Sequence, residues 1–328
     1  MDRFRTTLTV PPAPFRIDHH TPVSCIGSCF AEEIGKRMQR LKFPVALNPM
    51  GILYNPVSVA NCLERLLDPR PYELADLVAH DGLWHSFDHH GSFSHPDPTI
   101  ALGRIDEALS HASVFLKKSR RLILTFGTAH VFKLKDSGRV VANCHKMPAS
   151  MFSRVRLEVE EVVAALEPVF TRLFESLPDL EIIGTVSPVR YLRDGLVESN
   201  LSKATLLLAL ERLRRLFPRL HYFPAYELLI DDLRDYRFYA EDMSHPAPAA
   251  IQYIWEHFLL SHCDAPTIGL CRELENLRRA MEHRPLHPGS EAHRQFLARQ
   301  AEKCRQLAAA HPELDFSEEL KFFEGGPH

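Results

Sequence analysis

The sequence lacks several features that mark particular classes of protein. No apolar run in its 328 residues approaches the roughly 18 residues that a membrane-spanning helix needs. Basic residues are not in excess, because 39 Lys and Arg stand against 42 Asp and Glu and the formal net charge is -3. Such a chain has no electrostatic match to nucleic acid or to an anionic membrane. We therefore expect neither of them as a partner.

Cysteine is present in a small and odd number. The seven cysteines are scattered along the chain, which favours free thiols in a reducing compartment over a disulfide framework. Residues 1–6 have no long apolar run behind their charges, unlike a secretory leader. Together these features predict a cytoplasmic protein.

Three common motifs are missing as well. The chain contains no Gly-x-Gly-x-x-Gly loop, no Walker-type loop and no Gly-x-Ser-x-Gly elbow. Their absence argues against a dinucleotide enzyme, a P-loop enzyme and an ordinary α/β-hydrolase. We therefore expect no cofactor.

Apolar runs alternate with longer segments of helical period. The expected strands are residues 23–26, 45–47, 121–126, 181–186 and 220–223, and the expected helices between them are residues 30–41, 56–67, 105–117, 157–176 and 200–217. This order predicts a three-layer α/β/α sandwich around a mostly parallel sheet.

Two segments interrupt the alternation. Residues 80–98 are rich in His, Asp, Ser and Pro, and residues 131–141 have the pattern of a hairpin. We expect both to leave the sheet near the ligand-binding face. After a helix over residues 247–261, the tail is helical and polar, with a Pro-rich break at 283–288. We place a catalytic domain at residues 1–262 and a helical C-terminal extension at residues 263–328.

A serine stands where the first expected strand meets the first expected helix. The strand ends at Gly27-Ser28-Cys29-Phe30-Ala31, and a helical pattern begins at once. Such a turn presents a side-chain oxygen at a point that helix amides also face. This is the geometry of a nucleophile.

A second chemical element comes late in the chain, where Asp242 precedes His245 by three residues. At this spacing the carboxylate can turn back onto the imidazole and fix its tautomer, which leaves the other ring nitrogen for a serine. About one Asp-x-x-His is expected by chance in a chain of this composition, so the motif alone is weak.

The five residues 27–31 match the signature of the GSCFA family, and the chain resembles this branch of the SGNH/GDSL hydrolases over nearly its whole length. In that pattern the serine turn comes first and Asp-x-x-His comes last, before the final helix. The resemblance implies an SGNH/flavodoxin-like fold. It also implies that Ser28 attacks an acyl carbonyl, that His245 takes its proton and that Asp242 orients the imidazole.

Such a hydrolase needs donors for the oxyanion. The Ser28 amide is the first, and by resemblance the second is the amide of Gly51. SGNH enzymes take the third from an asparagine in a Gly-x-Asn-Asp turn, but here Gly127 is followed by no asparagine. We expect Asn143, within a stretch that resembles a second GSCFA motif, to replace it, with Thr128 as the fallback.

Each assignment has a structural competitor. Ser28 is also a good helix cap, and Cys29 at a helix N-terminus is either a rival nucleophile or, as we favour, a core residue. His245 competes with a surface histidine, Asn143 with a turn asparagine, and the two glycines with ordinary positive-φ turns. Arg190, after a strand end, lies either over the site or in a structural salt bridge.

Residues 80–95 hold an unusual density of imidazoles and carboxylates: His80, Asp81, His85, Asp88, His89, His90 and His95. Such groups can bind zinc or another divalent ion. No His-Glu-x-x-His or Cys-x-x-Cys spacing selects a metal, so we favour a polar loop beside the cleft.

Three hypotheses follow. The leading one is a serine hydrolase or O-acyltransferase acting on an acyl ester of a carbohydrate or another small metabolite. The second is a non-catalytic binding module on a degenerate SGNH fold. The third is a metal-dependent hydrolase centred on residues 80–95. The sequence does not indicate an oligomeric state.

Overall fold

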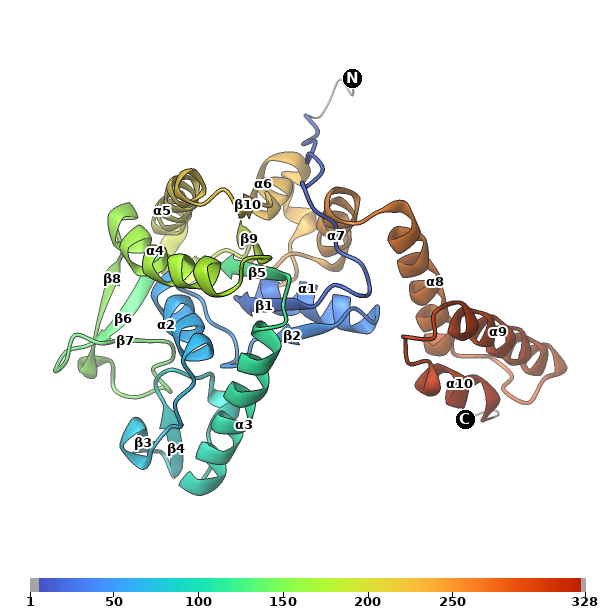
Figure 1. Cartoon of the computed structure of the whole chain (residues 1–328), viewed down its shortest axis with the longest axis horizontal. Coiled ribbons are helices and arrows are strands. Elements are labelled where there is room, and N and C mark those ends of the chain that lie inside the picture. Colours follow the sequence, from blue (N-terminus) through green and yellow to red (C-terminus); the bar gives the residue numbers. More distant parts are fainter. Residues whose placement is uncertain (1–5, 326–328) are drawn as a thin grey trace.

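The computed structural model describes residues 6–325. Residues 1–5, which include most of the N-terminal segment considered above, and residues 326–328 lie outside the described residues. A five-stranded sheet lies at the centre (Figure 1). Its strands are β1 (Val23–Gly27), β2 (Val45–Leu47), β5 (Arg121–Phe126), β9 (Glu181–Val186) and β10 (Leu220–Tyr222).

The sheet has the order β10-β9-β5-β1-β2, and every neighbouring pair is parallel. Counting these five strands along the chain gives the order 2-1-3-4-5 of flavodoxin-like folds. In β5 and β9 all residues after the first are buried, as expected for strands covered on both faces. The predicted parallel sheet is confirmed.

Helices cover both faces of the sheet, and each face has its own apolar core. One core joins the sheet to α2 (Pro56–Leu67), α3 (Pro98–Leu116), α4 (Val159–Ser176) and α5 (Gly195–Leu216). The other joins it to α1 (Cys29–Arg40) and α7 (Pro248–His262). The three-layer sandwich predicted from the sequence is therefore present.

Capping residues explain where two of these helices begin. The side chain of Asn55 accepts a hydrogen bond from the Ser58 amide at the start of α2, and Asp97 accepts one from the Thr99 amide at the start of α3. Helix α1 differs, because its N-cap, Ser28, makes no side-chain capping bond.

Two antiparallel insertions leave the sheet on the same side of the molecule (Figure 1). The first contains β3 (Leu77–His80) and β4 (Leu83–Ser86), and the second contains β6 (His130–Leu134), β7 (Val140–Val141) and β8 (Phe152–Arg156). The Ala142 amide donates to the Phe87 carbonyl at 2.8 Å and joins them. The predicted hairpin is confirmed, but β8 was not expected.

Short helical turns complete the sandwich: η1 (Leu74–Asp76), η2 (Gly91–Phe93), η3 (Ala149–Met151), η4 (Leu192–Asp194), α6 (Ala225–Glu227), the π-helical η5 (Leu228–Leu233) and η6 (Tyr236–Phe238). The two that matter for the site are η4, which follows β9, and η6, which precedes the Asp-x-x-His loop.

The tail forms α8 (Ala265–Glu282), α9 (Glu291–Ala310) and α10 (Ser317–Glu324), with the break where the prolines predict it. Buried side chains of these helices belong to the same apolar core as α1 and α7. The boundary between residues 262 and 263 stays a prediction. Across residues 6–325, no helix combines the length and the apolar character needed to cross a bilayer.

Candidate functional site

Ser28 lies between β1 and α1 and is only 1% exposed. Its hydroxyl oxygen is buried and has no hydrogen-bond partner within the part of the chain that the structure describes. Leaving a buried polar group unpaired costs about 1–3 kcal/mol, so such a group calls for an explanation. The capping interpretation does not supply one, because the hydroxyl does not bond to α1.

The space beside Ser28 is shared with Tyr54, Gly127 and Tyr191. A Cβ placed on Gly127 would collide with the Tyr191 hydroxyl, and it would lie 3.2 Å from the Tyr54 carbonyl oxygen and 3.4 Å from the Ser28 Cβ. The phenol of Tyr191 and the Cβ of Ser28 therefore lie next to the same face of Gly127. Burial raises the pKa of Tyr191 well above its ordinary value, so the hydroxyl stays protonated.

The structure brings Asp242 and His245 together. The Nδ1 of His245 lies 2.6 Å from the Asp242 Oδ2, and the Oδ1 accepts the amides of His245 and Ser244 at 3.0 and 2.9 Å. These bonds, led by the His245 amide and followed by its ring, lower the pKa of Asp242 to about 2. The carboxylate is thus ionised and fixes the imidazole with Nε2 directed away.

Ser28 and His245 are not joined by a hydrogen bond in this conformation, since the Ser28 hydroxyl has no partner among residues 6–325. The imidazole of His245 is 48% exposed, whereas Ser28 is buried. The Ser28 turn and the Asp242–His245 pair are therefore both formed, but no hydrogen bond joins them.

Arg190 directly precedes Tyr191 and bonds to the Asp-x-x-His loop. Its amide donates to the Ser244 carbonyl at 3.0 Å. Its guanidinium lies 4.2 Å from the ring centre of Tyr239 and 5.3 Å from that of Tyr236. Arg190 therefore stacks on aromatic rings and forms no salt bridge within residues 6–325, while its expected place over the site stays a prediction.

The expected backbone donors already have acceptors, which differs from the prediction. The Ser28 amide donates to the Thr125 carbonyl at 3.1 Å, because β1 continues its pairing with β5 one residue beyond Gly27. The Gly51 amide closes a turn onto the Asn48 carbonyl at 2.7 Å. The Gly127 amide donates to the Tyr54 carbonyl at 2.8 Å. In this conformation none of the three amides is free for a ligand.

The two candidates for the third donor also make hydrogen bonds, although the bond of Asn143 uses its side-chain oxygen and not its Nδ2 donor. The Oδ1 of Asn143 accepts the His145 amide at 2.9 Å, as a turn asparagine does. The Thr128 hydroxyl lies 3.0 Å from the hydroxyl of Ser202 and accepts the His130 amide.

Lys203 is a site residue that the sequence analysis missed. It is buried in α5, and its Nζ donates to the carbonyls of Gly127 and Ser187, each at 2.6 Å. Burial lowers its pKa to about 7. Its two bonds join the ends of β5 and β9. Its Nζ also lies 5.2 Å from the ring centre of Tyr191. The sequence could have indicated this burial, because Lys203 stands three residues before Leu206 and therefore lies on the same buried face of α5.

The histidine rings of the first insertion contact groups within that insertion and in the neighbouring one. His85 contacts the Ser94 hydroxyl at 2.7 Å and the His80 carbonyl at 3.1 Å, and it stacks on His145 at 4.4 Å. Burial lowers the pKa of His89 to about 4. Among the described residues, no group of three or more His, Cys, Asp and Glu is arranged to hold a metal ion.

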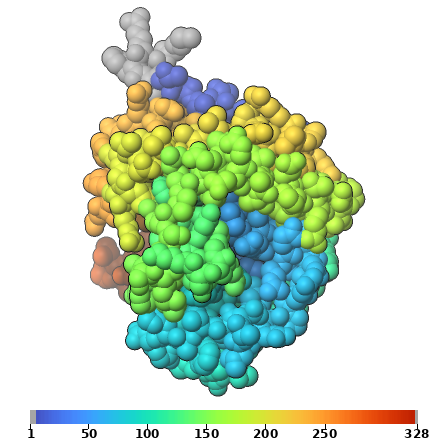
Figure 2. Space-filling view, turned by 90° about the vertical axis from the view of Figure 1, so that its left-hand side faces the viewer, coloured from blue at the N-terminus to red at the C-terminus, as the bar shows by residue number. Residues whose placement is uncertain are grey.

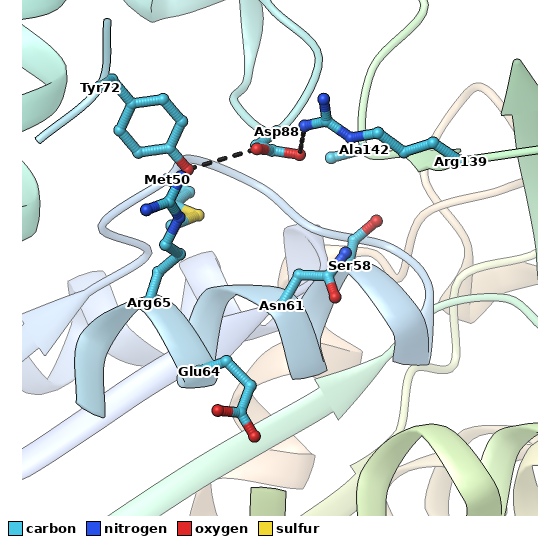
Figure 3. A pocket seen from close by; sticks show the side chains of 9 residues that line it. All are labelled: Met50, Ser58, Asn61, Glu64, Arg65, Tyr72, Asp88, Arg139 and Ala142. Atoms are coloured by element: carbon cyan, nitrogen blue, oxygen red, sulfur yellow. Dashed lines mark hydrogen bonds and ion pairs between the residues drawn. The ribbon is translucent and has the colours of Figure 1, made fainter. Parts of the chain in front are cut away.

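A cavity of about 300 Å³ lies between α2 and the two insertions (Figure 3). Its walls are Met50, Ser58, Asn61, Glu64, Arg65, Tyr72, Asp88, Arg139 and Ala142. Asp88 pairs with Arg139 at 2.6 Å and accepts the Tyr72 hydroxyl at 3.3 Å. In Figure 2 the blue to cyan segments, which include α2 and β3–β4, meet the green β6–β8 insertion on this face.

This cavity adjoins the predicted site without containing it. Met50 and Ala142 directly precede Gly51 and Asn143, but neither Ser28 nor His245 lines its walls. The cavity therefore lies behind the loops that were expected to hold the oxyanion.

Comparison with protein families matches both parts of the chain. The GSCFA family matches residues 22–258, which include the serine turn and the Asp-x-x-His loop. The chain belongs to the GSCFA family. A second family, described as "GSCFA domain protein, C-terminal domain", matches residues 274–325 of this GSCFA protein, which run from within α8 to just past the end of α10.

Solved structures give only distant likenesses. A provisionally assigned platelet activating factor from Streptococcus pneumonia is 13% identical, with a TM-score of 0.37, over 73% of this chain and 82% of that one. An acetyl xylan esterase from the rumen bacterium Butyrivibrio proteoclasticus is 12% identical, with a TM-score of 0.37, over 84% of this chain and 66% of that one. At these scores neither supports an argument about chemistry. No curated protein matches the chain.

Proposed function

We propose that this GSCFA protein is a serine-dependent ester hydrolase or O-acyltransferase, acting on an acyl ester of a carbohydrate or another small metabolite. The observation that carries the proposal is the unpaired hydroxyl of Ser28 at the start of α1, within the GSCFA signature. The fixed Asp242–His245 pair supplies a base whose tautomer is set.

The reaction follows from these groups. As the Ser28 Oγ bonds to the acyl carbon, its proton passes to the Nε2 of His245, and Asp242 stabilises the imidazolium. The tetrahedral intermediate then expels the alcohol, which takes that proton. Water or an acceptor alcohol releases the acyl group from Ser28 by the same steps in reverse.

This reaction requires a rearrangement of the site. The buried Ser28 hydroxyl must become accessible, and the His245 loop must approach it, before the proton can pass. Catalytic hydrogen bonds are often long in unliganded enzymes and tighten in the substrate complex. Gly51, Gly127 and Asn143 serve as oxyanion or substrate donors in this proposal, the two glycine amides once they exchange their present acceptors for the ligand.

We place the protein in the cytoplasm, with no nucleic acid or membrane as partner. The support for this location is the state of its cysteines, all seven of which are free thiols.

A non-catalytic binding module is the second candidate. The observation that favours it is the engagement of the Ser28, Gly51 and Gly127 amides by backbone carbonyls, which leaves no amide pair prepared for an oxyanion. In that case Ser28 would bond to a ligand without attacking it.

Labelling with a fluorophosphonate distinguishes the candidates. We expect mass spectrometry to find the probe on Ser28, and we expect Ser28→Ala and His245→Ala to abolish the labelling while a surface control, Ser92→Ala, leaves it unchanged. A folded protein that takes up no probe would favour the binding module. Esterase activity that survives Ser28→Ala and disappears with a chelator would instead indicate a metal-dependent hydrolase.

A further inference from the structure

Asn48 lies directly after β2, with its side chain against the residue that precedes Ser28. Its Oδ1 accepts the Gly27 amide at 2.9 Å, which fixes which end of the side-chain amide is oxygen and which is nitrogen. The Nδ2 is buried and has no hydrogen-bond partner anywhere in residues 6–325. Asn48 is only 8% exposed, so water cannot readily serve as that partner.

Two unpaired polar atoms therefore flank Gly27: a donor on Asn48 and the hydroxyl of Ser28. Each leaves a desolvation penalty of about 1–3 kcal/mol unsatisfied. An acyl carbonyl group has a use for each of them, because its oxygen accepts a hydrogen bond from an amide and its carbon is attacked by a hydroxyl oxygen. The pair thus indicates a ligand with a carbonyl.

The backbone of Asn48 supports a functional reason for this side chain. Its φ is +43°, in the left-handed region that few side chains other than asparagine tolerate. Its own carbonyl accepts the Gly51 amide at 2.7 Å, and its amide donates to the Cys25 carbonyl at 2.9 Å. Both bonds hold the residue in place beside β1.

We propose that the Nδ2 of Asn48 donates a hydrogen bond to the acyl carbonyl oxygen of an ester bound at Ser28, and to the oxyanion formed from it. As the Ser28 Oγ bonds to the carbonyl carbon, the π electrons move onto that oxygen, whose charge Asn48 stabilises. This residue would do the work of the asparagine missing after Gly127. The inference rests on the proposed function of Ser28.

Asn48→Asp is the decisive variant. The aspartate keeps an oxygen for the Gly27 amide but removes the donor. We expect kcat for hydrolysis of p-nitrophenyl acetate to fall by about 10²–10³-fold with KM nearly unchanged, as when one oxyanion donor is lost. Asn48→Gly, which tolerates the left-handed backbone, should lose a similar factor.

Asn55→Asp provides the matched control. Asn55 is also buried and follows β2, but both ends of its side chain bond to Ser58. Since aspartate is an equally good helix cap, this variant should keep its kcat. A purely structural role for Asn48 would lower the unfolding temperature and leave kcat per folded molecule intact, which would overturn the proposal.

A second measurement does not depend on turnover. In Ser28→Ala protein labelled with ¹⁵N, the side-chain amide signal of Asn48, identified by its loss in Asn48→Asp, should shift when acetate is added. An unmoved signal would overturn the carbonyl-binding role. If wild-type protein fails to react with the fluorophosphonate but this signal shifts, then the proposed hydrolase is wrong and the carbonyl site remains.

Discussion

The backbone amide of Arg190 donates to the carbonyl of Ser244 at 3.0 Å. This bond joins two segments with different tasks at one site. The first continues into Tyr191, which lies beside Gly127 near Ser28, and the second holds the Asp242–His245 pair. The position of the Asp-x-x-His loop is therefore fixed relative to the residues that follow β9.

Replacing Asp242 by asparagine tests the orienting role. We expect kcat to fall by about 10⁴-fold, because the amide can no longer stabilise the imidazolium or hold the correct tautomer. The control is Asp235→Asn, an exposed aspartate that also caps a turn ahead of the same loop. Equal loss in both variants would mean that the loop, and not the carboxylate, matters.

The pH dependence of activity follows from the same bond. Hydrogen bonds from His245 and Ser244 lower the pKa of Asp242 to about 2, so the stabilising contribution of its carboxylate is present above its ordinary pKa and is lost only as the pH falls through about 2. Any loss of kcat between about pH 5 and 8 must therefore come from a group other than Asp242. An NMR titration that gave Asp242 a pKa near its ordinary value would contradict this.

Gly127→Ala should place a methyl group against the Tyr191 hydroxyl and beside the Ser28 Cβ. Overpacking of this kind costs about 1–3 kcal/mol, so we expect a lower free energy of unfolding and a changed rate of Ser28 labelling. Tyr191→Phe removes the atom that the methyl meets. The double variant should therefore recover part of the loss, as a double-mutant cycle in urea would measure.

Gly269→Ala is the control for this cycle. Gly269 lies in α8, where an added Cβ meets nothing within 4 Å. Alanine is favoured over glycine in a helix by about 1 kcal/mol, so this variant should be slightly more stable than wild type. Additivity of Gly127→Ala and Tyr191→Phe would show that the two positions do not touch.

Lys203 predicts an unusual dependence of stability on pH. Burial lowers its pKa to about 7, whereas a lysine in the unfolded chain has an ordinary pKa of about 10.4. Between these values the unfolded chain binds more protons, so raising the pH favours the fold. Relative to Lys203→Met, the wild-type free energy of unfolding should rise from pH 7 to 9, by up to about 1.4 kcal/mol per pH unit.

Urea titrations at the two pH values measure this difference. The wild-type lysine retains two N–H donors for the Gly127 and Ser187 carbonyls when it is neutral, so its bonds survive the change. A difference between wild type and Lys203→Met that stays constant with pH would mean that Lys203 keeps its charge in the fold.

The central sheet could be predicted from the sequence because its strands are short apolar runs between turn residues. The expected bounds of β2, β5 and β9 coincide with those observed. Helix α3 begins at Pro98, seven residues before the expected start, because its Asp97 cap and its first residue fall within the polar excursion. Strand β8 was missed because Ser153 and Arg154 break the apolar pattern.

Only part of the candidate site could be predicted from the sequence. Asp242 and His245 are neighbours in sequence, so their contact follows from spacing. By contrast, Lys203 meets Gly127 across 76 positions, and Asn48 meets Gly27 across 21. Such contacts depend on how the strand ends align in the sheet, which local periodicity does not encode.

The C-terminal helices are predicted to depend on one partly buried ion pair. Lys42, just after α1, lies 2.8 Å from the Glu319 carboxylate of α10, with the two side chains 17% and 6% exposed. Its Nζ also lies 5.0 Å from the ring centre of Phe316. Glu319→Gln would leave the ammonium without its countercharge. Removing one partner of a fully buried pair costs about 3–5 kcal/mol, and for this partly buried pair we expect about 1–3 kcal/mol.

The measurement is the urea midpoint of Glu319→Gln, with Arg212→Gln as control. Arg212 pairs with Glu160 where both side chains are more than half exposed, so its loss should change stability by less than about 1 kcal/mol. Because Glu319 pairs with Lys42, which follows the end of α1 opposite to Ser28, its variant should react with the fluorophosphonate at the wild-type rate below the transition. Slower labelling of folded Glu319→Gln would mean that the C-terminal helices also shape the catalytic end of α1.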